Sequence, residues 1–322
     1  MPVKSSSLPE SPSVPTVSIG IPVYNSGELI RDCLEDVLAQ TFQDFQILIY
    51  DNASTDQTGE IAREFAKKDP RISYVRQVEN KGAVQNFVDV LNAADAKYFM
   101  WHADDDRLSP NFLEAMVEIL NANSNADLAV GAVHSFNHIK DELKEASFPT
   151  PWSKIQLATS IRQLLGSRAS WFYGLWRSEY LRQRFNYLTA AYPRIIGFDH
   201  LLLFLPIIEG RVVGSNQGVF YQFRGAKVVE PSRSANTRLK SKKPELQEKV
   251  QAKLADRSKF RKACLADLGR SHLPAWQRAI AFPFVIAHAD RCSHSTARKL
   301  VHINFCIAQM SLLNFFKKPM GR

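Results

Sequence analysis

The sequence has few cysteines and no long hydrophobic run, and each absence excludes a class of protein. Only four of the 322 residues are cysteines, and they lie far apart, with no Cys-x-x-Cys pair and no cluster of His and Cys at zinc-ligand spacing. A disulfide-stapled scaffold is therefore excluded, and a reducing compartment is favoured. The nearest approach to a membrane-spanning helix, 300–316, carries His302, Asn304 and other polar side chains, which predicts an interfacial or buried segment.

The first 16 residues are rich in Ser and Pro and lack the apolar segment of a signal peptide. They offer too few apolar side chains to offset the entropy cost of ordering, so we expect a flexible lead-in over 1–16. These features predict a protein that is not secreted and is located in the cytoplasm.

The sequence contains 45% hydrophobic residues, enough to bury a full core, and its basic charge lies at the C-terminal end. Residues 231–322 hold 19 Lys and Arg against 5 acidic residues, whereas 1–230 hold 22 against 27. A basic region of this kind suits an anionic lipid surface, a nucleic acid or a phosphate-bearing acceptor. The alternative is a solvated basic helical region with no such partner.

Short apolar runs alternate with amphipathic segments from Val17 onward. The runs 17–23 and 45–50 are typical of buried strands that end in polar loops, and hydrophobic residues at helical spacing follow over 28–40 and 58–68. The rhythm continues to 128–136, weakens over 141–153, and ends in an apolar run over 218–224. The alternation predicts an α/β fold with a mostly parallel, mixed sheet flanked by helices, with ligands at the carboxyl ends of the strands.

Two acidic loops follow expected strands, and the second contains Asp104, Asp105 and Asp106. Adjacent carboxylates repel one another unless a cation neutralises them, and their hard oxygens suit Mg²⁺ or Mn²⁺ rather than a soft metal. A solvated acidic turn before the helix that starts near Pro110 explains the triplet equally well.

Four motifs in order resemble family 2 inverting glycosyltransferases of the GT-A fold. They are Val17-Ser-Ile-Gly-Ile-Pro-Val-Tyr-Asn25, the stretch from Gln40 to Asp56, Asn80-Lys-Gly82, and Tyr98-Phe-Met-Trp-His-Ala-Asp-Asp-Asp106. The resemblance covers roughly 17–225. It implies a GT-A-type nucleotide-binding fold, a nucleotide-sugar donor and a divalent cation, Mn²⁺ or Mg²⁺.

The resemblance also implies roles for particular residues. The donor nucleotide is expected to contact Pro22, Tyr24, Asn25, Asp51, Asn52, Lys81 and Asp104. Asp105 stands at the metal-binding acid of the family motif and Asp106 beside it, while Ala103 occupies the usual first acid. Asp104 or Asp106 must then substitute for that acid.

An acid that enters a later helix serves as the base in this family, and Asp199 fits the place. Inversion at an anomeric carbon needs one carboxylate to accept the proton of the acceptor hydroxyl, with no covalent intermediate. Alternatively, Asp199 caps a helix, and His200 beside it is a packing or surface residue. The aromatic residues Trp101, Trp171, Phe172, Tyr173 and Trp176 are expected to belong mainly to the core.

These observations predict three parts and one leading function. The parts are the lead-in 1–16, a GT-A catalytic domain over 17–230 and a basic helical region over 231–322. Within the catalytic domain, 17–120 would bind the nucleotide sugar and 121–230 the acceptor. The leading function is metal-dependent, inverting sugar transfer to an acceptor hydroxyl in the synthesis of a cell-surface polysaccharide or glycolipid.

The acceptor is expected to be a saccharide or a lipid-linked saccharide, and no nucleic acid is expected. Apolar residues over 279–289 lie near Arg278, which suggests helices on an anionic membrane surface or, equally, packing on the catalytic domain or a second subunit. Two other functions are weighed. A nucleotide-sugar nucleotidyltransferase would need a Gly-rich phosphate loop after the first strand, which is absent, and a nucleic-acid-binding module would need a recognition motif, which is also absent.

Overall fold

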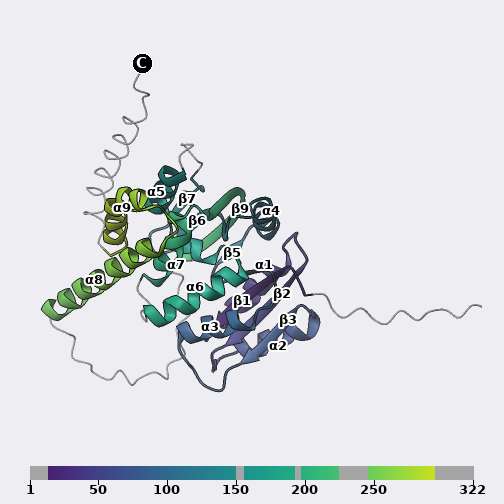
Figure 1. Cartoon of the computed structure of the whole chain (residues 1–322). Helices are drawn as coiled ribbons and strands as arrows, with labels where there is room; N and C mark the ends of the chain where they lie inside the picture. The colour runs from purple at the N-terminus through teal and green to yellow at the C-terminus, as the bar shows by residue number, and fades with distance from the viewer. Residues whose placement is uncertain (1–13, 150–155, 193–196, 225–245, 294–322) are drawn as a thin grey trace, which may run out of the picture.

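The computed structural model describes residues 14–149, 156–192, 197–224 and 246–293, with strands gathered in one sheet and helices around it (Figure 1). The strands are β1 (Val17–Val23), β2 (Phe45–Asp51), β3 (Ile72–Arg76), β4 (Tyr98–Trp101), β5 (Arg107–Leu108), β6 (Leu128–Asn137), β7 (Glu142–Ala146), β8 (Leu175–Arg177) and β9 (Val212–Arg224). The helices are α1 (Leu29–Leu38), α2 (Thr58–Lys68), α3 (Ala83–Ala93), α4 (Phe112–Ala122), α5 (Gln156–Gly166), a 3₁₀ turn (Ala169–Tyr173), α6 (Ser178–Ala191), α7 (Phe198–Ile208), α8 (Leu246–Arg270) and α9 (Ala275–Ser293).

The sheet has the order β3-β2-β1-β4-β8-β6-β9-β5, and β7 pairs with β6. β1 runs parallel to β2 and β4, and β2 runs parallel to β3, so their carboxyl ends meet at one edge. β8 is antiparallel to both β4 and β6, whereas β6 and β9 are parallel. The predicted α/β fold with a mixed sheet and flanking helices is confirmed.

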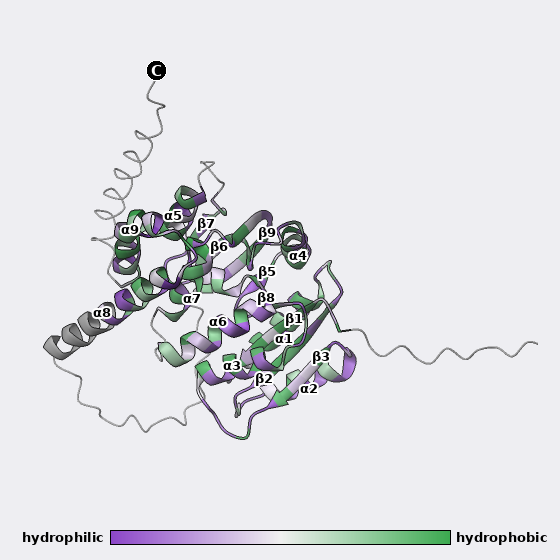
Figure 2. Cartoon of the chain, viewed as in Figure 1, coloured by the Kyte–Doolittle hydropathy of each residue, from purple (hydrophilic) through white to green (hydrophobic). Residues whose placement is uncertain are grey.

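The core forms where apolar periodicity matches the element. The central strand β1 is buried on both faces, as expected for a strand covered by helices on either side. In α1, Ile30, Cys33, Leu34 and Val37 repeat at three- and four-residue spacing, and all four are buried. Figure 2 shows the same pattern, since helices at the surface carry both hydrophobic and hydrophilic residues along their turns.

Three short strands and one strand start differ from the sequence predictions. β5, β7 and β8 have two, five and three residues, too few to show an alternating pattern. β7 lies inside the stretch 141–153, which was expected to be irregular, and pairs antiparallel with β6. β9 begins at Val212 rather than at 218 because it pairs with β6 over the whole length of that strand.

The two C-terminal helices pack on the rest of the chain, since α8 contacts α7 and α9 contacts both α5 and α8. The apolar stripe over 279–289 is mostly buried in these contacts, including Ala281, Phe284 and Val285. Packing on the rest of the chain, one of the two alternatives for this stripe, is therefore what the structure shows for its buried part. Segments 300–316 and 1–13, and the expected boundary near 230, lie outside the described residues.

A membrane-spanning segment is not found among the helices of the described residues, since none is both long and apolar enough to cross a bilayer.

A buried ion pair joins α8 to α6. The Arg184 guanidinium bonds both carboxylate oxygens of Asp267 and also donates to the carbonyl of Leu201 at the start of α7. Both side chains of the pair are almost fully buried, with 5% and 2% exposed. This contact ties a C-terminal helix to the helix that carries Asp199.

Replacing Asp267 with alanine is expected to lower the free energy of unfolding by about 3–5 kcal/mol, because it leaves the charge of Arg184 buried without its partner. Urea denaturation of the full chain measures the change. The control is Glu179→Ala on α6, which breaks the exposed pair with Arg182 and is expected to cost less than about 1 kcal/mol. Equal losses in the two variants would mean that this pair does not hold α8 in place.

Candidate active site

The loops after β1 and β2 lie together at the carboxyl edge of the sheet, where Val23 is opposite Asp51. Asn25 joins them, since its Oδ1 accepts the N–H of Thr55 at 2.8 Å and its own N–H donates to Ser54 Oγ at 2.9 Å. Its φ of 54° lies in the left-handed region, which Asn tolerates better than most residues. Asn25 therefore shapes the loop, while the neighbouring Tyr24 ring is 49% exposed and Pro22 is half-buried.

Asp51 is fully buried at the end of β2, and its carboxylate accepts hydrogen bonds from its own chain. Oδ1 accepts the N–H of Ser54 at 2.8 Å, and Oδ2 accepts the Tyr74 hydroxyl at 2.7 Å. Arg76 Nη1 lies 3.5 Å from Oδ2. Asp51 thus organises the loop, and any contact with a nucleotide base would share oxygens that already have donors.

Replacing Asp51 with asparagine is expected to lower the free energy of unfolding by about 1–3 kcal/mol, because one acceptor of a buried hydrogen-bond set becomes a donor. We also expect weaker nucleotide binding. Thermal unfolding and nucleotide titration measure the two effects, and Tyr74→Phe, which removes one bond only, is the control. Full stability with lost nucleotide affinity would mean that Asp51 serves the ligand and not the loop.

Asn52 connects this loop to the segment before α3. Its Nδ2 donates to Asn80 Oδ1 at 2.8 Å, and its Oδ1 accepts the backbone N–H of Lys81 at 2.9 Å. Lys81 itself is exposed, and its ammonium group lies 3.3 Å from Asp89. The structure therefore gives Asn52 a part in holding the loop, and it leaves Lys81 at the surface near the same edge.

The three consecutive aspartates after β4 have different surroundings. Asp104 is half-buried and Asp105 is exposed, whereas Asp106 is only 3% exposed and accepts the N–H of Phe223 on β9 at 3.2 Å. Arg107 does not neutralise them, because its guanidinium bonds backbone carbonyls of the triplet and pairs with Asp32. Within the described part of the chain, these three carboxylates have no Lys or Arg partner.

Burial, and then the repulsion between neighbouring carboxylates, raises the pKa of two of the three acids. Burial first, and then the charge of Asp105, raise the pKa of Asp106 to about 7. Burial and the charge of Asp104 raise the pKa of Asp105. Hard oxygens that repel one another without a basic partner fit a divalent cation such as Mg²⁺ or Mn²⁺. Among the described residues these three acids do not converge within 4.8 Å, so one or two of them would ligate the cation.

The raised pKa of Asp106 predicts how stability depends on pH when no divalent cation is present. Between about pH 4 and 7 the folded chain holds a proton on Asp106 that the unfolded chain has lost, so the free energy of unfolding falls as pH rises through this range. The loss is up to roughly 4 kcal/mol. Urea denaturation in chelator at pH 5 and pH 8 measures it, with Asp106→Asn as the reference. An equal pH dependence in that variant would assign the loss to other groups.

Asp199 lies in a cavity of about 370 Å³. The cavity is lined by Ala83, Val84, Phe87, Ala169, Ser170, Phe172, Tyr173, Phe185, Gly197, Phe198, Asp199 and Gln222. The N-cap position of α7 is Gly197, with φ 79°, and Asp199 sits in the first turn, where its Oδ1 accepts the N–H of His200 at 2.8 Å. Asp199 therefore supports the helix start and lines the cavity at the same time.

Tyr173 connects the cavity to the aspartate triplet. Its ring stacks on Phe220 of β9, and its pKa is raised by burial and then by the negative charges of Asp106, Asp105, Asp199 and Asp104. Tyr173 and Asp199 line the same cavity as Gln222, and the next residue, Phe223, donates its N–H to Asp106, so the fold brings the two groups of acids to one region. The sequence analysis treated Tyr173 as a core residue. The structure shows that it also lines the cavity with Asp199, a residue distant in sequence.

The remaining aromatic candidates follow the prediction. Trp101, Trp171 and Trp176 are buried, and the Trp101 ring stacks on Phe172 at 4.6 Å between centroids. Phe172 also lines the cavity. The tryptophans therefore belong to the core, and Trp101 contacts the cavity through Phe172.

Comparison with known proteins gives consistent matches. The sequence model of a family described as "Glycosyl transferase family 2" matches residues 18–189. Glycosyltransferase GlyA of Streptococcus pneumoniae is 33% identical over 121 residues, which is 38% of this chain and 17% of that protein. The uncharacterized glycosyltransferase EpsJ of Bacillus subtilis is 25% identical over 189 residues, which is 58% of this chain and 53% of that protein. The chain thus spans about half of EpsJ and less of GlyA.

Among solved structures, S. aureus TarS 1-349 is similar in fold. It superposes with a TM-score of 0.61 and 15% sequence identity over 88% of this chain and 73% of that chain. The same protein in complex with UDP-GlcNAc superposes with a TM-score of 0.58 and 14% identity over 86% of this chain and 72% of that chain.

Proposed function

Because this chain belongs to glycosyl transferase family 2, we propose that it transfers a sugar from a nucleoside-diphosphate sugar to an acceptor hydroxyl with inversion of the anomeric carbon. One observation carries the proposal. Asp199 lines the same cavity as Gln222, and the neighbouring Phe223 donates its N–H to Asp106 of the aspartate triplet, so one region offers both a base and carboxylates for a cation.

Different residues of the site would bind the nucleotide, bind the cation and accept the proton. The loop from Asp51 to Asp56, with Tyr24 exposed beside it, would receive the nucleotide. Asp105 and Asp106, with Asp104 beside them, would hold Mn²⁺ or Mg²⁺. When bound, the cation would neutralise the charge of the leaving diphosphate. Asp199 would accept the proton of the acceptor hydroxyl, which makes that oxygen a stronger nucleophile.

The carboxylates proposed to bind the cation and the carboxylate proposed as the base stand on different elements of the fold. Asp106 is anchored by the N–H of Phe223 on β9, whereas Asp105 is exposed and its carboxylate is bonded only locally, to backbone of its own residue. Asp199 lies on α7, and its orientation is set by the N–H of His200. A base and a cation site on different elements can act on opposite faces of a sugar, as inversion requires.

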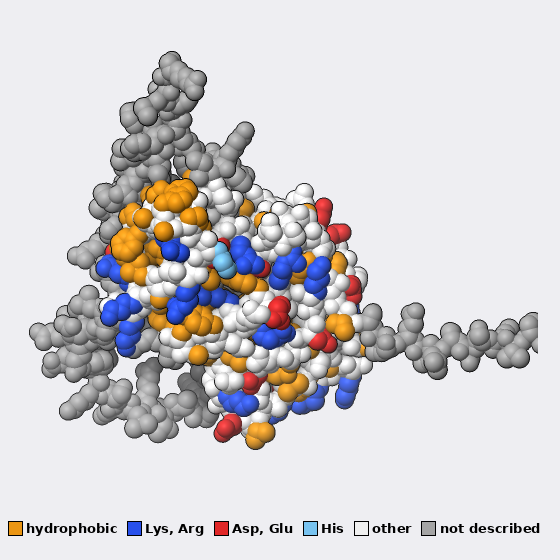
Figure 3. Space-filling view, viewed as in Figure 1, with side chains coloured by type: hydrophobic (Ala, Val, Ile, Leu, Met, Phe, Trp, Pro, Cys, Tyr) orange, Lys and Arg blue, Asp and Glu red, His pale blue; other side chains and the backbone are white. Residues whose placement is uncertain are grey.

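For the acceptor we infer a saccharide or lipid-linked saccharide, used at an anionic membrane surface on the cytoplasmic side. Trp276 and Phe282 of α9 are 62% and 50% exposed. Figure 3 shows hydrophobic side chains gathered where α9 lies, with Lys and Arg side chains close by. Apolar and basic side chains in one place favour an interface with anionic lipid.

Nucleotide-sugar hydrolysis and transfer, measured with a panel of donors by mass spectrometry, test the proposal. UDP sugars are the first donors to try, because TarS has been solved in complex with UDP-GlcNAc. We expect turnover with Mn²⁺ or Mg²⁺ and none with chelator. Pyrophosphate release from a nucleoside triphosphate and sugar phosphate would instead indicate a nucleotidyltransferase, and failure with every donor would reject the transferase.

A further inference from the structure

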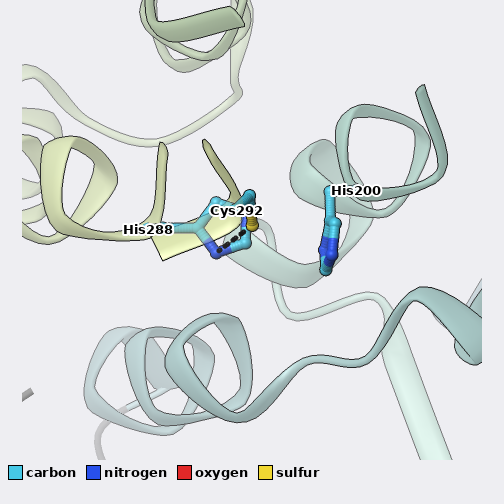
Figure 4. A group of neighbouring side chains, drawn as sticks. All are labelled: His200, His288 and Cys292. Atoms are coloured by element: carbon cyan, nitrogen blue, oxygen red, sulfur yellow. Dashed lines mark hydrogen bonds between the residues drawn. The ribbon is translucent and has the colours of Figure 1, made fainter. Parts of the chain in front are cut away.

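A second group of possible metal ligands includes His200, the residue after Asp199. His200 follows Asp199 on α7, and His288 and Cys292 are four residues apart on one face of α9. One ligand atom from each of the three lies within 4.8 Å of the others, the one such group of three His, Cys, Asp or Glu side chains in the described residues. Figure 4 shows the two helices meeting at these side chains.

The distances suit a tetrahedral metal. Two ligands that are each about 2.0–2.3 Å from zinc, at the tetrahedral angle, lie about 3.3–3.8 Å apart. Cys292 Sγ is 3.7 Å from His288 Nε2 and 4.0 Å from Nδ1, so the sulfur lies beside the ring, and a side-chain rotation would bring Sγ and Nε2 onto one ion. The rings of His200 and His288 have centroids 5.7 Å apart and planes at 75°, which lets their nitrogens approach one point from different directions.

The hydrogen bonds of His288 prepare Nε2 for a metal. Its Nδ1 lies 3.1 Å from the carbonyl oxygen of Leu164, and a carbonyl only accepts, so the ring proton belongs on Nδ1. Nε2 then carries the lone pair that a metal needs. A ligating histidine typically donates its other N–H to a backbone carbonyl in this way.

Arg291 approaches the same region without upsetting this assignment. Its Nη2 lies 3.2 Å from His288 Nδ1, but it also donates to the carbonyls of Leu164 and Ser167 and to the Ser167 hydroxyl. Three oxygen acceptors satisfy this group, so it does not need the ring nitrogen. His288 itself is only 1% exposed.

We propose that His200, His288 and Cys292 form a zinc site that joins α9 to α7. Imidazole nitrogen and thiolate sulfur select Zn²⁺, whereas the carboxylates of Asp104, Asp105 and Asp106 select Mg²⁺ or Mn²⁺. The chain would therefore hold two cations of different hardness. The sequence analysis found no zinc-ligand spacing because one of the three ligands comes from a helix distant in sequence.

The zinc site has a mechanical consequence for its surroundings. It would cross-link the last described helix to the first turn of α7, next to Asp199. Zinc would therefore stabilise the docking of the C-terminal helix, and the folded chain would resist unfolding better with zinc than without it.

The test uses the full-length chain, stripped with chelator and titrated with Zn²⁺ and with Co²⁺ as a coloured substitute. We expect about one zinc ion per chain and a sulfur-to-cobalt charge-transfer band. A large excess of Mn²⁺ should leave the band unchanged. Absence of tight zinc binding to the wild type, or displacement of Co²⁺ by Mn²⁺, would overturn the proposal.

Cys292→Ser is the main variant, because Cys292 is half-buried and serine keeps its shape. We expect zinc affinity to fall at least about 100-fold and the charge-transfer band to vanish. His288→Gln should lose zinc as well, and its melting temperature in chelator shows whether it folds. His272→Ala removes an exposed histidine paired with Glu209, and it should bind zinc as the wild type does.

Thermal unfolding supplies the second readout. With chelator, the wild type and Cys292→Ser should melt at similar temperatures, and zinc should raise the melting temperature of the wild type only. An equal rise in Cys292→Ser would place the zinc elsewhere and overturn the assignment. Zinc binding by Asp105→Asn should be unchanged, since that substitution affects the hard-cation site; loss of zinc there would also contradict two separate sites.

Discussion

Replacing Asp105 with asparagine is expected to lower the turnover number for sugar transfer on the order of 10²-fold or more, with little change in fold. The side chain is exposed and makes no ion pair with the described residues, and the asparagine oxygen can keep the local backbone hydrogen bond of the carboxylate. What is lost is a ligand for the cation that neutralises the leaving diphosphate. Steady-state kinetics at saturating donor, with Mn²⁺ titrated in each variant, measure the effect.

The neighbouring acids provide matched comparisons. Asp106→Asn removes the charge but keeps an oxygen for the N–H of Phe223. Asp104→Asn removes the charge at a half-buried position. Glu118→Gln on the exposed side of α4 is the control for loss of an acid elsewhere. If Asp105→Asn keeps its rate while Asp104→Asn or Asp106→Asn does not, the metal ligands are those neighbours. If all three variants are fully active, the metal site itself is rejected.

Replacing Asp199 with asparagine is expected to abolish transfer while the affinity for the nucleotide stays the same. The asparagine oxygen can still accept the N–H of His200, so the first turn of α7 keeps its hydrogen bond. The amide cannot take a proton from the acceptor hydroxyl, and a general base typically contributes about 10²–10⁴-fold. The base acts on the acceptor and does not contact the nucleotide, so the two readouts separate.

The measurements are single-turnover transfer and nucleotide titration on the same preparation. Gln222→Ala, which changes another residue of the cavity lining, controls for a general disturbance of the cavity. Unchanged turnover in Asp199→Asn, or a loss of nucleotide affinity as large as the loss of rate, would falsify the assignment of Asp199 as the base.

Periodicity predicted most of the long elements correctly. The strand over 17–23 and the helix over 58–68 agree with the structure at both ends, because each has a strong apolar pattern and clear polar limits. The short strands β5 and β8 were missed, since they exist only through pairing with β9, β4 and β6. Such pairing depends on partners far along the chain, and no local pattern reports it.

The sequence indicated where the candidate acids stand relative to strands and helices. It did not indicate how buried each acid is or which groups it bonds. The family resemblance implied roles for Asp51 and Asp199, and the acidic triplet with Asp104 follows a strand. The structure places Asp51 at the end of β2, Asp104 after β4 and Asp199 in the cavity lining, while their roles stay predictions. The sequence analysis did not predict that Asp51 is fully buried or that Asp106 is held by β9. These differences arise from hydrogen bonds between separate elements.

The sequence by itself determined the α/β alternation, the order of the motifs and the carboxyl-edge location of the acids, because these depend on local periodicity and on the direction of parallel strands. Only the tertiary structure decided which aspartate is buried, that Tyr173 lines a cavity with Asp199, and that His200 meets His288 and Cys292. Each of these facts depends on the packing of segments that are distant in sequence, and packing sets burial, charge and ligand distance together.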